Sequence, residues 1–275
     1  MIELLQTIRL DVAESLRARW FLVYAVVFGA LVALLFGFGL ADSRVLGFTG
    51  LSRLLVTFIQ LSMAILPVFV LISTVRSLAG DREAGVLEYM LSLPVSLRGW
   101  YWGRFVGRFA VVLLPVLLAM AGAVAYGAAM GASIPWFQFL LYVGLLLSLA
   151  VCFLGLGFLI SSLARSVDIA QGVAFLVWLT LVLFLDLILL GLLIKHQASL
   201  ELIVGIAVLN PLQAFRAAAI MLFDPELVML GPSAFIILDR FGHSGYLAWA
   251  LLYPLVLGIV FGMLGYLVFR NRDLP

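Results

Sequence analysis

Six long apolar stretches divide the sequence, and short polar passages separate them. Each has about 20 or more residues with few charges, the length that an α-helix needs to cross the roughly 30 Å hydrocarbon core of a bilayer. The pattern predicts an all-α integral membrane fold with six transmembrane helices, and we treat residues 1–275 as one transmembrane domain. The expected spans are 20–41, 54–78, 105–130, 136–163, 170–194 and 247–269.

A further apolar stretch, LELIVGIAVLNPLQAFRAAAIMLF (200–223), is long enough to suggest a seventh span. Asn210 and Pro211 divide it into halves that are each too short to cross, and an odd number of spans would separate the two termini. An Asn followed by Pro is a typical N-cap and first residue of a helix. We therefore expect two short helices at the outer membrane surface, between the fifth and sixth spans.

The first twenty residues have the periodicity of an amphipathic helix. Arg9, Glu14 and Arg17 fall on the face opposite to the apolar positions. Such a helix is typical of a segment that lies on the membrane interface. The apolar positions are Ile2, Leu5, Ile8, Val12 and Leu16.

The distribution of basic residues gives the expected orientation, because Lys and Arg collect in the cytoplasmic connections of membrane proteins. With six spans, eleven arginines fall on the side of the termini and five basic residues on the other. Both termini are therefore expected in the cytoplasm. The first group is Arg9, Arg17, Arg19, Arg76, Arg82, Arg98, Arg104, Arg108, Arg165, Arg270 and Arg272, and the second is Arg44, Arg53, Lys195, Arg216 and Arg240.

Composition supports a membrane protein and argues against several kinds of chemistry. Hydrophobic residues make up 65% of the chain and charged residues 11%. Cys152 is the single cysteine, so neither an intrachain disulfide nor a cysteine-built metal site can form. Lys195, the single lysine, lies outside any G-x-x-x-x-G-K-[ST] motif, and no H-E-x-x-H motif is present. We expect no catalytic residues, resident metal, bound cofactor or nucleic-acid partner.

Charged residues gather in one passage, GDREAGVLEYMLSLPVSLRGWYWGRFVG (80–107). Apolar residues from Val86 to Leu91 follow helical spacing, with acidic Asp81 and Glu83 near the start, and Pro94 ends the pattern. The passage predicts a short amphipathic cytoplasmic helix between the second and third spans. Charge bias alone would explain the arginines but not the apolar ridge, so we interpret the helix as a lever on which a soluble motor acts.

The same passage resembles the connection between the second and third spans of ABC exporter permeases, whose pattern runs roughly R/E-x-G-T-L-x-x-L-L-S-x-P-x-S and then G-K/R-F. Three further segments are similar to the permease of the transporter that matures nitrous-oxide reductase: VLGFTGLSR (45–53), LFLDLILLGLL (183–193) and VLNPLQAFR (208–216). Val86 stands where the pattern has threonine. The residues that match the pattern are Glu83, Gly85, Leu87, Leu91, Pro94, Gly103, Arg104 and Phe105.

The resemblance implies a homodimer in a bacterial inner membrane that carries a separate cytoplasmic ATPase, which binds ATP and Mg²⁺. For the narrower group it also implies a periplasmic copper-site assembly protein. That partner would dock between the fifth and sixth spans, around Asn210, Pro211 and Arg216. The ATPase-coupling residues implied are Asp81, Arg82, Glu83, Gly85 and Glu88, with Arg165 to Asp168 as a second contact.

Asp186 lies inside the fifth span, where a lone carboxylate costs about 2.5–3.5 kcal/mol and should find a partner. Gln60 in the second span has a comparable depth, so we expect a hydrogen bond between these two side chains. Three roles for Asp186 stay open at this point: hydrogen bonding that holds helices together, contact with cargo, and gating. In a different class of protein, a proton-coupled secondary transporter, Asp186 would be the proton site.

Small residues recur every four positions at Gly99, Gly103 and Gly107, and again at Gly258 and Gly262. This spacing favours close helix packing, with a dimer seam as an alternative. Met63, Met120 and Met130 stand in different spans without a paired spacing, so we interpret them as ordinary apolar residues and not as copper ligands. An exporter of a lipid, polymer or small molecule is the alternative within the same class.

Overall fold

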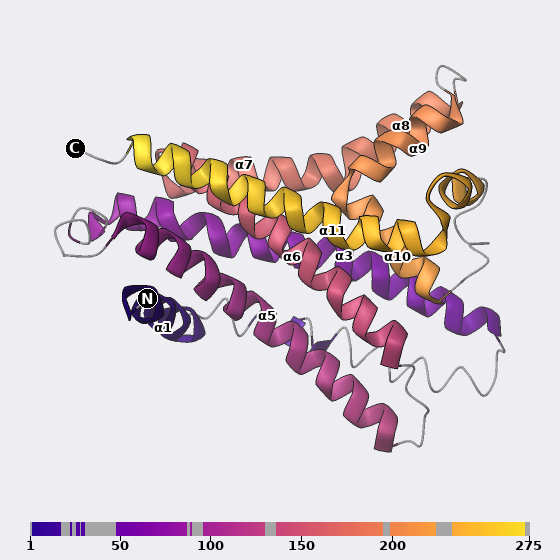
Figure 1. Cartoon of the computed structure of the whole chain (residues 1–275), viewed down its shortest axis with the longest axis horizontal. Helices are drawn as coiled ribbons and strands as arrows, with labels where there is room; N and C mark the ends of the chain where they lie inside the picture. The colour runs from indigo at the N-terminus through magenta and orange to yellow at the C-terminus, as the bar shows by residue number, and fades with distance from the viewer. Residues whose placement is uncertain are drawn as a thin grey trace.

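The computed structural model describes residues 2–17, 48–86, 96–129, 136–194, 199–223 and 233–272, with single positions at 23, 26, 27, 29, 30 and 89. Every regular element in these residues is a helix (Figure 1). The expected first span, 20–41, lies almost entirely outside the described residues. The all-α architecture is confirmed for the part of the chain that is described.

Five described helical stretches are long and apolar enough to cross a membrane, or six if a bent pair of shorter helices counts as one crossing. The five correspond to the second through sixth expected spans. They are α3 (Phe48–Glu83), α5 (Leu97–Ala129), α6 (Trp136–Leu163), the continuous run of α7 (Val167–Leu179), η1 (Thr180–Phe184) and α8 (Leu185–Ile194), and α11 (Ser233–Arg272).

Hydropathy located these helices well but missed several of their ends. The ends of α6 are those expected, whereas α3 continues beyond 78 to Glu83 and α5 already begins at Leu97. A helix does not end where the hydrocarbon ends, because charged side chains can continue it into the interfacial region. The last helix, α11, begins at Ser233 and bends at Gly242, whose φ of 66° is a conformation that favours glycine.

The core lies around α6, which packs against α11, α3, α10 and α5. Its buried side chains include Phe153 and Phe158, both fully inaccessible. At the crossing with α11, a Cβ atom on Gly155 or Gly258 would overlap the backbone of the other helix. Small residues that let two backbones touch are typical of membrane helix pairs, where packing replaces the hydrophobic effect.

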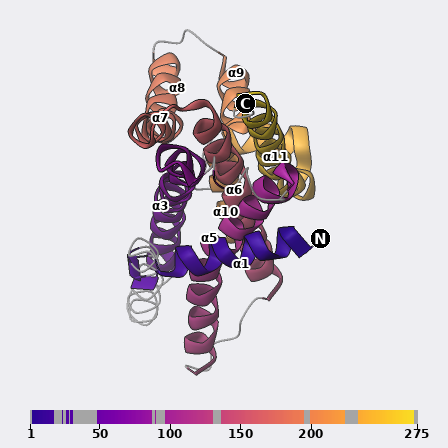
Figure 2. The ribbon, with the colours of Figure 1, turned by 90° about the vertical axis from the view of Figure 1, so that its left-hand side faces the viewer.

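The N-terminal helix, α1 (Ile2–Arg17), lies across the long axis of the bundle and packs on α5 (Figure 2). The predicted helix is therefore confirmed. The start of α1 and the end of α11 lie toward the same end of the molecule, on the left in Figure 1, together with the end of α3 and the start of α5. We call this the arginine-rich end, because Arg82, Arg98, Arg104 and Arg165 occur there.

Between α8 and α11, two short helices form a hairpin bent by 100°. α9 (Leu200–Leu209) and α10 (Pro211–Phe223) meet at Asn210, as the sequence predicts. The expected surface position is wrong for α10, since all side chains from Pro211 to Leu222 are buried except the half-buried Arg216. Four alanines in this helix explain the burial, because they let it pack closely against α6, α11 and α3.

Candidate functional site

The end of α3 is bonded directly to the turn between α6 and α7. Arg82 donates from Nη1 to the carbonyl oxygen of Ala164 over 2.6 Å, and the Glu83 carboxylate accepts from the backbone N–H of Val167 over 3.1 Å. These are the groups that a helix leaves without internal partners, a carbonyl after the last turn and an N–H in the first. The described parts of the two segments expected to contact an ATPase, the end of α3 and the α6–α7 turn, are therefore joined directly.

A buried serine supports the same junction from inside the bundle. Ser161 of α6 donates from Oγ to the carbonyl oxygen of Val75 over 2.7 Å and accepts from the N–H of Ala79 over 2.9 Å. Its side chain is fully inaccessible. The last two turns of α3 are thus held to α6 before the charged residues begin.

The expected position of the acidic residues in this region is wrong. Asp81 and Glu83 do not begin a separate helix but lie in the last turn of α3, where the helix dipole disfavours carboxylates. The bonds to Arg104 and Val167 offset that cost. α3 ends at Glu83, and Gly85 two residues later has a left-handed φ of 68°. The N–H of Tyr89 donates to the carbonyl oxygen of Gly85 over 3.5 Å. The predicted lever, including Glu88, falls mostly outside the described residues.

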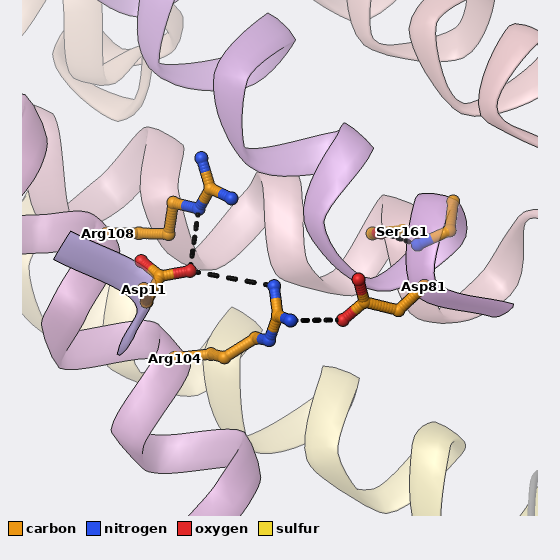
Figure 3. A network of polar contacts seen from close by, with 6 residues as sticks. Asp11, Asp81, Arg104, Arg108 and Ser161 are labelled. Carbon is orange, nitrogen blue, oxygen red and sulfur yellow. Dashed lines mark hydrogen bonds and ion pairs between the residues drawn. The ribbon is translucent and has the colours of Figure 1, made fainter. Parts of the chain in front are cut away.

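Four buried charges connect α3, α5 and α1 (Figure 3). Arg104 lies 2.5 Å from Asp81 and 3.6 Å from Asp11, and Arg108 lies 3.2 Å from Asp11. The exposed fractions of these side chains range from 1% for Asp11 to 14% for Asp81 and Arg108. Two positive and two negative charges balance, which is the condition for burying ions at tolerable cost.

Arg104 also reaches the C-terminal helix through an aromatic pair. Its guanidinium lies 5.1 Å from the centre of the Trp100 ring, and that ring stacks on Phe269 of α11 at 5.5 Å. Such a contact between a cation and an aromatic ring is favourable where the cation is largely removed from water. We call Asp11, Asp81, Arg104 and Arg108 the charge network. It links α1, α3 and α5 at the arginine-rich end, and the stack of Trp100 on Phe269 adds α11.

Sequence analysis missed Asp11, the most deeply buried member of the charge network. Asp11 follows Ile8 by three residues and precedes Val12, so it lies beside the apolar stripe of α1 and not opposite to it. Arg104 and Arg108, four residues apart, share one face of α5. An acid beside an apolar stripe was the signal that could have identified it.

The glycines expected in helix packing and the loop residues expected at an ATPase contact differ in burial. A Cβ atom at Gly107 would come within 3.0 Å of Asp11, so this glycine lets α1 approach α5 closely. Gly99 receives a cap from Ser96 Oγ at 3.2 Å, and Gly103 is buried. Arg165 and Asp168 are exposed beside Ser166, which caps α7. A dimer seam at the glycines and an ATPase contact at the turn stay predictions.

Asp186 is not bonded to Gln60. Its carboxylate accepts from Gln213 Nε2 over 2.5 Å and lies 3.8 Å from Arg216 Nη1, both on α10. Gln60 is exposed on α3. A similar depth in two spans does not say toward which neighbour a side chain points. Because α10 is buried, Gln213 comes within reach of Asp186.

The expected docking residues of an outside partner do not form a surface. Asn210 is 3% exposed, Pro211 is buried, and Arg216 points to Asp186. A groove of about 660 Å³ does open nearby, between α9 and α11, with the ion pair of Glu201 and Arg240 on its wall. A partner at this end would meet that groove before it met Asn210.

The described residues contain no group of three or more His, Cys, Asp or Glu side chains placed to hold a metal ion. Met63 and Met120 are buried in the core, and Met130 lies outside the described residues. The side chains at the arginine-rich end instead join helices to one another by ion pairs and hydrogen bonds.

A model of the family described as ABC-2 family transporter protein matches residues 5–274. The chain therefore belongs to the ABC-2 transporter family. It is a multi-pass permease subunit of an ABC transporter. Permeases of this kind are generally non-catalytic, and membership implies an ATPase partner.

Two curated relatives carry the same name. The chain is 28% identical over 222 residues to the probable ABC transporter permease protein NosY of Pseudomonas aeruginosa, which covers 78% of this chain and 81% of that protein. It is 26% identical over 214 residues to the probable ABC transporter permease protein NosY of Stutzerimonas stutzeri, covering 76% and 78%. The resemblance to this group of permeases, inferred from the sequence, is confirmed.

Proposed function

We propose that this chain, as one transmembrane domain in a homodimer, converts ATP-driven closure of a separate cytoplasmic ATPase into movement of its membrane helices. ATP and Mg²⁺ belong to the partner. The observation that carries the proposal is the pair of bonds from Arg82 and Glu83 to the α6–α7 turn. Because of these two bonds, a displacement of the end of α3 also displaces the α6–α7 turn, and the reverse.

The surrounding contacts define how such a push would spread. α3 is one helix from Phe48 to Glu83, so displacement of its last turn is carried toward the opposite side of the membrane. The ion pair between Asp81 and Arg104 transfers the same displacement to α5, and the Asp11 contacts transfer it to α1. Buried pairs resist separation strongly, because breaking one leaves an uncompensated charge.

For the process served, we propose maturation of the copper sites of periplasmic nitrous-oxide reductase, with a copper or sulfur species as cargo. Support comes from the similarity to two NosY permeases and from the segments 45–53, 183–193 and 208–216. A periplasmic copper-site assembly protein would then meet the end of the molecule formed by α8 and α9. Export of a lipid, polymer or small molecule is the alternative cargo within the same mechanism.

A proton-coupled secondary transporter is the weaker proposal. It would use Asp186 as its proton site, but Gln213 and Arg216 already occupy that carboxylate. Both partners lie on α10, so this carboxylate already joins two helices of the same chain.

The test compares a strain that lacks this chain with the same strain complemented by the wild-type gene. Nitrous-oxide reductase should accumulate with an incomplete copper site in the first strain and with a complete site in the second. A complete reductase together with defective lipid or polymer export would favour the alternative cargo. In liposomes, cargo movement driven by a proton gradient without any ATPase would contradict the ATP-driven mechanism.

A further inference from the structure

The fifth span contains a π-helical turn at the level of the α9–α10 hairpin. η1 covers Thr180–Phe184, and such turns interrupt the regular hydrogen-bond ladder and often occur at functional places. Asn210 Nδ2 donates to the carbonyl oxygen of Leu181 within this turn over 2.9 Å, while Asn210 Oδ1 accepts from the N–H of Leu212 over 3.0 Å. One buried side chain therefore begins α10 and holds it to the fifth span.

Asp186 adds a second connection just after the π-helical turn. Both of its polar contacts, Gln213 at 2.5 Å and Arg216 at 3.8 Å, run to α10. Gln213 and Arg216 are three residues apart, so they lie on one face of α10. The Asp186 carboxylate therefore contacts both side chains on that face.

The sixth span holds the hairpin in a different way. Trp249 Nε1 donates to the carbonyl oxygen of Val208 over 3.3 Å, and the Tyr253 hydroxyl donates to that of Leu209 over 2.6 Å. These are the last carbonyls of α9, which have no partner inside the helix. The α11 bonds thus hold the end of α9, whereas the Asp186 contacts hold α10.

Apolar packing contributes little on the side of the fifth span. Only 6% of the apolar window within Val167–Ile188 is buried inside the protein, and Leu187 and Ile188 beside Asp186 are 53% and 60% exposed. Where few apolar contacts hold two helices together, polar contacts decide whether they stay together.

We propose that Asp186 is the positioning residue of α10: its carboxylate latches this buried helix to the fifth span, and the latch opens when the transporter changes conformation. The latch itself follows from the contacts above, while its opening in a cycle rests on the proposed function. Asp186 is therefore assigned a role in holding a re-entrant helix and not in binding cargo.

The experiment measures how fast a cysteine on α10 reacts with a membrane-impermeant maleimide. Cysteine replaces Ala218, which is fully buried, and Cys152→Ala removes the native thiol. Loss of a charge-assisted hydrogen bond should raise the labelling rate roughly tenfold in Asp186→Leu. Asp186→Glu should restore slow labelling, because it keeps the carboxylate. Gln60→Leu is the matched control, since it removes another polar side chain from a span without touching α10.

Unchanged labelling in Asp186→Leu, or an equal rise in Gln60→Leu, would overturn the latch. If Asp186→Leu does not fold, Gln213→Leu replaces it and should give a smaller increase, because the contact between Asp186 and Arg216 remains. In Asp186→Leu combined with Gln213→Leu, the rate should rise no further than in Asp186→Leu alone. A fully additive increase would show that the two side chains act separately and would also overturn the proposal.

A second arm adds the ATPase partner and nucleotide. Nucleotide should accelerate labelling of wild type and leave Asp186→Leu, whose latch is already open, unchanged. If the partner hydrolyses ATP but labelling of wild type does not respond, the latch does not open in the cycle and that part is overturned. If the proposed function itself were wrong, the complex of permease and ATPase would show no ATP hydrolysis coupled to the permease, which distinguishes the two failures.

Discussion

Glu83 accepts a hydrogen bond from the backbone N–H of Val167, a residue 84 positions later in the chain. The bond connects the C-terminal end of the second span with the N-terminal end of the fifth. It uses the acidic side chain that the helix dipole of α3 disfavours to satisfy an N–H that the helix dipole of α7 makes positive. The two loops are therefore connected within the permease itself.

The first prediction concerns this bond. Glu83→Leu should lower transport per ATP hydrolysed several-fold, because the α6–α7 turn no longer follows α3. Glu83→Gln should have a smaller effect, since an amide oxygen still accepts the Val167 hydrogen bond without the charge. Transport and ATP hydrolysis are measured together in liposomes that contain the permease and its ATPase.

The control for this experiment is Arg76→Gln on the same helix, where the side chain is exposed. It should leave the ratio of transport to hydrolysis unchanged. Arg82→Gln should behave like the Glu83 variants, because it loses the bond to Ala164. Normal coupling in both Arg82→Gln and Glu83→Leu would show that the two loops act independently.

The second prediction concerns the charge network. Arg104→Leu should destabilise the protein by about 3–5 kcal/mol, because it removes the cation that Asp81 and Asp11 share and leaves Arg108 to balance two buried carboxylates. The same change at exposed Arg98, in the first turn of α5, should stay within about 0.5 kcal/mol. Denaturant unfolding in detergent measures both. Equal stability of the two variants would mean that the network is solvated and contributes little.

Part of this architecture could be predicted from the sequence, and α6 shows why. Its apolar run has few competing features, so hydropathy gave both ends, Trp136 and Leu163. The break at Asn210-Pro211 was also predictable, because those residue types act locally. The ends of α3 and α5 were not, since charged residues continue a helix as readily as they end it.

The charge network and the partner of Asp186 depend on tertiary contacts. Asp11 looked like one of several charges on an amphipathic helix, and only the approach of α1 to Gly107 buries it. Gln60 and Asp186 were matched by depth, yet two helices can present side chains at one depth in different directions. The neighbour that Asp186 meets, Gln213, became available only because α10 folds inward.

The third prediction concerns the crossing of α6 and α11. Gly258→Ala should destabilise the protein by about 1–3 kcal/mol, because the added methyl group would overlap the backbone at Val151 and Cys152. Gly172→Ala on α7, where nothing lies within 4 Å, should be neutral or stabilising by up to about 1 kcal/mol, since alanine favours the helix. Thermal unfolding of both variants in the same detergent separates the two effects. A Gly258→Ala variant as stable as Gly172→Ala would contradict the close crossing.

We expect the ATPase to bind the arginine-rich end of this permease. The direct test places a photo-reactive phenylalanine analogue at Tyr89, just beyond the end of α3 and 64% exposed, and at Phe137, near the start of α6 at the opposite end and 71% exposed. After irradiation of native membranes, mass spectrometry identifies the attached protein. We predict an ATP-binding-cassette subunit attached at position 89 and not at 137. Attachment of that subunit at 137, or at neither position while the transporter is active, would contradict it.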